Sequence, residues 1–159
     1  MENWHPIAIY VGYAIDQAGE SVLEVETRIK QALGKSDLPL IAYFPRAPFF
    51  IQQKDELGSK WGFVREVNEA VIAAADGCLF LSSGGFSFGM PLEVDLVSRL
   101  GKPWLFVDES QKEIGGYLTA LASRDNYGVV SSNLLCVPSW LAEVAHNVGQ
   151  KRTRQCNTK

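Results

Sequence analysis

The chain has 159 residues, of which 47% are hydrophobic and 21% charged, and this composition excludes the disordered and fibrous classes. The net charge is −3 and the single basic cluster lies at the C-terminal end, so we expect no nucleic-acid partner. Three widely spaced cysteines without a CxxC pair favour a reduced, cytoplasmic protein that holds no metal. No basic leader and no apolar run of membrane-spanning length occur, so we expect neither secretion nor a membrane partner.

Short apolar segments alternate along the chain with segments of helical periodicity. Uniformly apolar runs of this kind are typical of strands covered on both faces. They predict strands at 7–13, 40–44, 77–82, 103–108 and 127–131. Helices are predicted at 20–33, 61–75, 90–100, 114–123 and 138–148. The alternation predicts one α/β domain, a doubly wound Rossmann/flavodoxin-like fold with a five-stranded, mainly parallel sheet and helices on both faces.

Between these elements, the loops that follow the strands are the places to look for a ligand. In a doubly wound sheet, ligands bind beyond the carboxyl ends of the strands, where the winding direction reverses. The longest irregular stretch, 45–60, carries two prolines and adjacent aromatic residues and is either a lid or a simple connector. The domain is expected to end near residue 148, and 149–159 to form a flexible basic tail.

The loop "SGGFSFG" after the third predicted strand combines glycines with serines just before a helix. Gly85 and Gly89 allow close approach of the backbone, the Ser87 hydroxyl is a donor, and the helix N-terminus favours negative charge. A phosphate cradle and a simple capped turn both remain open. The loop is neither a Walker loop, because no GK[ST] follows, nor a dinucleotide fingerprint.

The helix that follows this loop carries an acid where the pattern favours an apolar side chain. Glu93 lies four residues before Val97 and seven before Leu100, so the three share one predicted face. A glutamate in a first turn can point outward and interact only with the helix N-terminus. An inward glutamate must instead be hydrogen-bonded, ion-paired or used in chemistry.

Four sequence features in a fixed order carry a family resemblance. They are "IYVG" at 9–12, "AAD" at 74–76, "SFGMPLE" at 87–93 and "GKP" at 101–103. Together they resemble the nucleoside 2-deoxyribosyltransferase superfamily, in particular its nucleoside 5′-monophosphate N-glycosidase branch, the CMP and dNMP hydrolase-like proteins. The resemblance covers roughly residues 7–107. The S-x-G-x-x-x-E element is its most specific part and implies a substrate that carries a phosphate.

The resemblance implies roles for individual residues. Glu93 matches the family nucleophile, and Tyr10 matches the tyrosine that orients it. Ser87 and Gly89 match the pair that holds the 5′-phosphate, and Asp16 falls where family members contact the base or sugar.

Further candidates come from residue type and position around the same expected cleft. Gly85 belongs to the phosphate loop, and Tyr13 and Phe88 are aromatic residues that either pack or stack on the base. We expect no cofactor. The resemblance also implies a homo-oligomer, a dimer or larger.

One position departs from the family pattern. Many members carry an aspartate eight residues before the "AD" aspartate, where it helps the base to leave, and this chain has Asn68 there. Asparagine cannot donate a catalytic proton at neutral pH. Glu69 takes the role after a one-residue shift, or Asp16 or Asp95 does, or the protein binds nucleotides without cleaving them. A base with its own proton-accepting position would also need less help.

The expected activity is hydrolysis of a nucleoside or deoxynucleoside 5′-monophosphate to free base and sugar phosphate through a glycosyl ester of Glu93. The alternatives are base exchange between nucleosides and a non-catalytic nucleotide-binding or sensing module. A phosphoribohydrolase of the cytokinin-activating type is disfavoured, because its PGGxGTxxE signature is absent.

Overall fold

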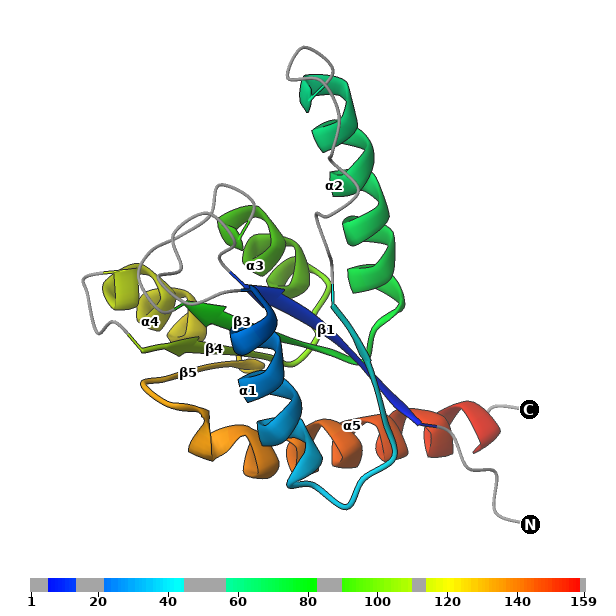
Figure 1. Cartoon of the computed structure of the whole chain (residues 1–159). Helices are drawn as coiled ribbons and strands as arrows, with labels where there is room; N and C mark the ends of the chain where they lie inside the picture. Colours follow the sequence, from blue (N-terminus) through cyan, green and yellow to red (C-terminus); the bar gives the residue numbers. More distant parts are fainter. Residues whose placement is uncertain (1–5, 14–21, 45–56, 83–89, 110–113, 158–159) are drawn as a thin grey trace.

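The computed structural model describes residues 6–13, 22–44, 57–82, 90–109 and 114–157, which form one layered α/β unit (Figure 1). Its strands are β1 (Ile7–Tyr13), β2 (Leu40–Tyr43), β3 (Gly77–Ser82), β4 (Trp104–Asp108) and β5 (Gly128–Ser131). All neighbouring strands are parallel, in the order β2-β1-β3-β4-β5. The predicted doubly wound, five-stranded fold is therefore confirmed, with the strand order of flavodoxin-like proteins.

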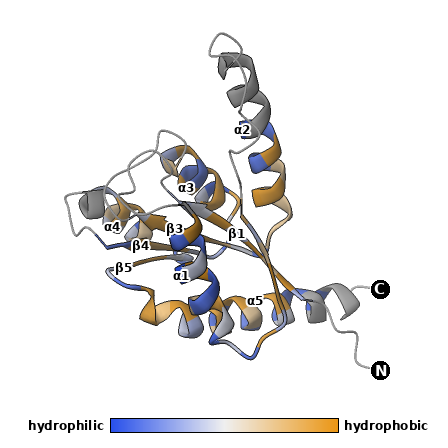
Figure 2. Cartoon of the chain, viewed as in Figure 1, coloured by the Kyte–Doolittle hydropathy of each residue, from blue (hydrophilic) through white to orange (hydrophobic). Residues whose placement is uncertain are grey.

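The helices cover both faces of the sheet. They are α1 (Val22–Gly34), α2 (Leu57–Ala74), α3 (Met90–Arg99), α4 (Ile114–Arg124) and α5 (Val137–Asn157), with the short 3-10 helix η2 (Leu134–Cys136) before α5. Side chains of α1 and α5 bury one face of the sheet, and those of α2, α3 and α4 bury the other. The apolar colouring of the central strands in Figure 2 reflects this two-sided burial. Within the described residues, no helix has the length and hydropathy needed to span a bilayer.

Two helices, α2 and α5, extend several residues beyond their predicted ranges. Helix α2 begins at Leu57, inside the stretch expected to be irregular, and its amino-terminal part projects beyond the sheet (Figure 1). Helix α5 continues to Asn157, so the expectation of a flexible tail from residue 149 is corrected: this segment is helical up to that residue. The prediction stopped before Gly149, but one glycine costs a helix only about 1 kcal/mol, and good helix formers follow it.

The "AD" element of the sequence has a structural role at the amino-terminal edge of the sheet. The Ala8 N–H donates to Asp76 Oδ2 at 2.9 Å, and the Asp76 N–H donates to the Ala8 carbonyl at 2.7 Å. This reciprocal pair joins the beginning of β1 to the turn that precedes β3. It therefore helps to set the register in which these two central strands pair.

The "GKP" element ends α3 and holds α2. Gly101 has φ of +65°, its N–H donates to the Ser98 carbonyl, and the Lys102 N–H donates to the Val97 carbonyl. These bonds form a Schellman motif, whose left-handed position favours glycine. The ammonium of Lys102 then donates to carbonyls in and just after the last turn of α2, those of Ile72, Ala73 and Ala75. The motif thus fixes the carboxyl end of one helix against the end of another.

We expect Gly101→Ala to lower the free energy of unfolding by about 1 kcal/mol, because alanine is strained at positive φ. Urea denaturation measures the loss. Gly34→Ala is the matched control, since Gly34 ends α1 without positive φ and a Cβ there meets no atom within 4 Å. Equal effects of the two substitutions would contradict the assignment.

Candidate active site

Two of the sequence candidates, Tyr10 and Glu93, meet on one face of the sheet, toward its carboxyl end between β1 and β3. The chain leaves β1 toward β2 on one side and reaches β3 on the other, so the winding direction reverses here. Tyr10 lies on β1, and Glu93 lies in the first turn of α3, the helix that follows β3. The positive end of a helix favours a carboxylate at this position.

A hydrogen bond joins these two residues, which are 83 positions apart in the chain. Tyr10 Oη donates to Glu93 Oε1 at 2.8 Å. The Tyr10 side chain is fully buried, packed against the tilted ring of Phe80 at 6.4 Å between centroids. A buried phenol on a central strand is held rigidly, so the donor that orients the carboxylate is fixed in place.

Asn68 also acts on the same carboxylate. Its side chain, on α2, is a hydrogen-bond donor that lowers the pKa of Glu93 and so favours the ionised form. Asn68 therefore lies at the site, as the family resemblance implies, but its amide acts on the nucleophile candidate itself. Its chemistry fits orientation of Glu93, because an amide N–H donor stabilises a carboxylate without supplying a proton.

Gly12 leaves the space that the carboxylate occupies. It lies two residues after Tyr10 on the same strand face, opposite Phe80 in the pairing register. A Cβ at Gly12 would come within 2.6 Å of the Phe80 ring and 3.1 Å of Glu93 Oε2. The motif "IYVG" contains Gly12, but only the pairing register shows that this glycine lies beside the acid.

Burial dominates the electrostatics of the site. Loss of hydration raises the pKa of Glu93 from 4.5 to about 7, and hydrogen bonds from Tyr10 and Asn68 hold it from rising further. Burial, with a smaller contribution from the Glu93 charge, also raises the pKa of Tyr10 and of the Cys78 thiol. Tyr10 and Cys78 therefore stay neutral, and Glu93 alone of the three changes charge near neutral pH.

Tyr43 is a neighbour that the sequence analysis did not select. It ends the edge strand β2, and β1 and β2 pair so that Tyr43 lies beside Tyr10. Their rings are stacked, with centroids 6.0 Å apart and planes 23° from parallel. Alternation along β2 could place Tyr43 on one face of the strand, but the pairing register that brings it to Tyr10 requires the structure.

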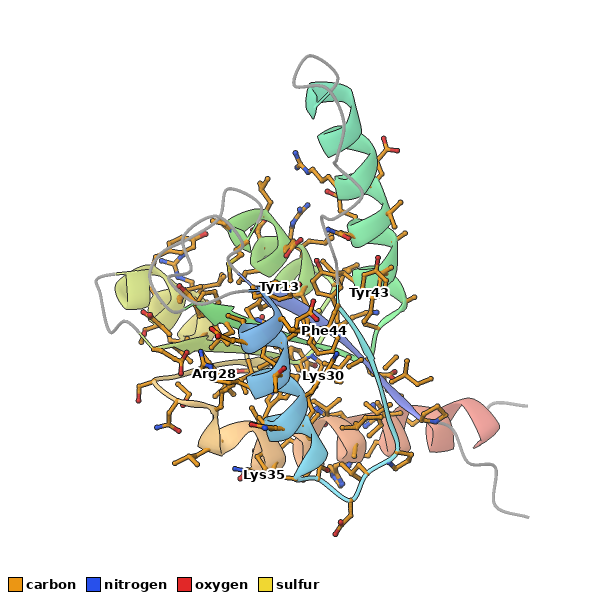
Figure 3. The ribbon with its side chains drawn as sticks, viewed as in Figure 1. Tyr13, Arg28, Lys30, Lys35, Tyr43 and Phe44 are labelled. Atoms are coloured by element: carbon orange, nitrogen blue, oxygen red, sulfur yellow. The ribbon has the colours of Figure 1, made fainter. Side chains whose placement is uncertain are left out.

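Tyr13, a predicted stacking residue, lies away from Glu93. Tyr13 faces the α1 and α5 side of the sheet, where its hydroxyl donates to the buried Glu26 at 2.8 Å. Beside this pair, the Lys30 ammonium lies over the Phe44 ring, 5.2 Å from its centroid (Figure 3). The Tyr13 ring is thus buried on the opposite face from Glu93, and its placement gives no support to a stacking role.

The alternative acids have arginine partners on their own helices. Glu69 pairs with Arg65 on α2 at 3.1 Å, and Asp95 pairs with Arg99 on α3 at 3.0 Å. Both carboxyl groups are exposed, at 44% and 49% of the side chain. The one-residue shift that would make Glu69 the acid is thus not seen, since Asn68 is the residue turned toward Glu93.

The predicted face of α3 is partly confirmed. Val97 is fully buried, together with Met90 and Val94, and Glu93 lies at the margin of this buried stripe. Leu100 is 43% exposed, which corrects the expectation that it shares the buried face, because it follows the last residue of α3 and precedes the turn at Gly101.

The remaining sequence candidates, Asp16, Gly85, Ser87, Phe88 and Gly89, lie outside the described residues, as does most of the possible lid at 45–60. The phosphate cradle therefore stays a prediction. Among the residues that are described, no group of three or more His, Cys, Asp or Glu side chains is arranged to hold a metal ion.

Comparison with known proteins adds no assignment. No protein-family model matches the chain, and no curated protein matches it significantly.

The raised pKa of Glu93 has a measurable effect on stability. Between pH 4.5 and about 7, the folded chain keeps a proton that the unfolded chain releases, so the stabilisation present below pH 4.5 is lost as the pH rises through 7. Glu93→Gln cannot titrate. We therefore expect it to gain on the order of 2–3 kcal/mol relative to the wild type between pH 4.5 and 8.5, measured by urea denaturation. Parallel pH profiles of the two proteins would contradict the assignment.

Proposed function

We propose that the protein hydrolyses the N-glycosidic bond of a nucleoside or deoxynucleoside 5′-monophosphate. The observation that carries the proposal is the hydrogen bond from the buried Tyr10 to Glu93 at the point where the sheet reverses its winding. A carboxylate held there by two donors, and ionising near neutral pH, has the chemistry of a glycosidase nucleophile.

In the proposed reaction, the Glu93 carboxylate attacks C1′ and forms a glycosyl ester while the C1′–N bond breaks. The base leaves with the bonding electron pair and takes a proton from water. A second water then attacks C1′ and gives its proton to the hydroxide left by the first water, which releases the sugar phosphate and regenerates the carboxylate. Tyr10 and Asn68 orient the carboxylate for its attack in the first step and stabilise it when it leaves C1′ in the second, which is the contribution of a preorganised site.

Release of free base from a panel of ribonucleoside and deoxyribonucleoside 5′-monophosphates, followed by chromatography, tests the activity. We expect turnover of at least one compound and a loss of at least about 10³-fold in Glu93→Ala, because the nucleophile is removed. Turnover that survives this substitution would exclude the mechanism. Adding a second free base to the assay distinguishes base exchange, which would produce a new nucleoside.

The second candidate is a nucleotide-binding module that does not cleave its ligand. It is favoured by the engagement of Asn68 with Glu93 and by the pairing of Glu69 and Asp95 with arginines, which leaves the departing base without help from these groups. Thermal stabilisation by a nucleotide without any released base would support it.

The substitution Asn68→Asp distinguishes two interpretations of this position. In the first, Asn68 orients Glu93; in the second, the site lacks a catalytic acid at residue 68. If Asn68 orients Glu93, an aspartate removes a donor and adds a like charge, which raises the pKa of Glu93 further. We expect kcat at pH 7 to fall roughly 10-fold and the acidic limb of the pH profile to move to higher pH. An increase in kcat would instead show that the site lacked an acid.

Glu69→Gln is the matched control for this substitution, because it alters the adjacent residue of α2, whose carboxylate is paired with Arg65. Its turnover should equal that of the wild type on the same substrate. A large loss of turnover would instead indicate that Glu69 takes part in catalysis.

A further inference from the structure

An exposed aromatic ring lies one side chain away from Glu93. Tyr43 is 37% exposed, whereas Tyr10, on which it is stacked, is fully buried. The buried ring carries the hydroxyl that donates to Glu93. One ring therefore links the carboxylate to the second, accessible ring.

Tyr43 differs from its strand neighbours Leu40 and Ala42, which pack in the hydrophobic core. Leu40 and Ala42 turn to the other face of β2 and pack against the core formed with α1 and α5. Tyr43 and Ile41 turn to the face that carries Tyr10, and Ile41 is 57% exposed. Neither side chain belongs to the buried cluster beneath α2, α3 and α4. Packing of the core thus does not account for an aromatic residue at this position.

The side chains of Tyr10 and Tyr43 project from their strands in the same direction. Residues paired in register on parallel strands project the same way, and the planes of these two rings are only 23° apart. Because Tyr10 donates to Glu93, the stacked Tyr43 ring lies on the same face of the sheet as the carboxylate. A ligand whose reactive carbon is at Glu93 therefore has the accessible tyrosine beside it.

We propose that Tyr43 is the stacking platform for the nucleobase of the substrate. This inference rests on the proposed function, because it takes C1′ to lie at Glu93. The base is bonded directly to C1′, and every nucleobase presents a flat π face that stacks on a tyrosine without regard to its hydrogen-bonding pattern. Tyr43 binds the base and fixes its plane, while the Tyr10 hydroxyl beneath it fixes the carboxylate. It is a positioning residue for the leaving group.

Binding to Glu93→Gln, which keeps the shape of the site and does not turn over, tests the platform by calorimetry. Titrations use the best nucleoside 5′-monophosphate of the panel and, separately, ribose 5-phosphate or its deoxy form. We expect Tyr43→Leu to raise the Kd of the nucleotide about 10-fold and to leave that of the sugar phosphate within twofold. Tyr43→Phe and Tyr43→Trp keep a ring and should bind the nucleotide within about threefold of the parent protein.

Ile41→Ala is the matched control. Ile41 is exposed and lies on the same face of β2, two residues before Tyr43. It should leave both Kd values unchanged. An unchanged nucleotide Kd in Tyr43→Leu would overturn the platform, and so would an equal loss for nucleotide and sugar phosphate, which indicates a distorted site. Tyr43→Met repeats the test if Tyr43→Leu unfolds at a lower temperature. If the parent protein binds no nucleotide, the proposed function fails first and the platform fails with it.

Discussion

The hydrogen bond between Tyr10 and Glu93 is the interaction on which the site depends, and the sheet topology makes it possible. The donor lies on the central strand β1, and the acceptor lies on α3, which is reached only after β3 has paired beside β1. The sheet order places β1 beside β3, Gly12 leaves space for the carboxylate, and α2 brings Asn68 to it. Many residues therefore specify the position of one acid.

The family-like motifs divide into two kinds when they are placed in the structure. Asp76 and Lys102 bind backbone groups at the ends of elements, and Gly101 supplies the left-handed residue after α3. Tyr10 and Glu93 instead meet each other. The first group holds α2 and the central strands in place, so the "AD" and "GKP" elements carry information about architecture. The proposed chemistry rests on the second pair, the tyrosine and the glutamate.

Most of the fold could be predicted because the strands are buried on both faces and read as uninterrupted apolar runs between glycines, prolines and charges. Helix ends were harder, since α2 and α5 extend past residues that usually stop a helix, where tertiary context outweighs local preference. The inward turn of Glu93 followed from helical periodicity. The positions of Gly12 and Tyr43 beside the site could not be predicted, because both follow from pairing register, and a one-residue slip would turn these residues to the other face.

The protonation of Glu93 and of the two polar groups beside it, Tyr10 and Cys78, determines the charge of this cluster. Tyr10 and Cys78 hold their protons because burial opposes a second negative charge beside the first, so only Glu93 exchanges a proton with solvent near neutral pH. The cluster thus has two charge states, zero and minus one, across the physiological range. Because the phenol and the thiol stay neutral in this range, the net charge of the cluster is set by the single proton of Glu93.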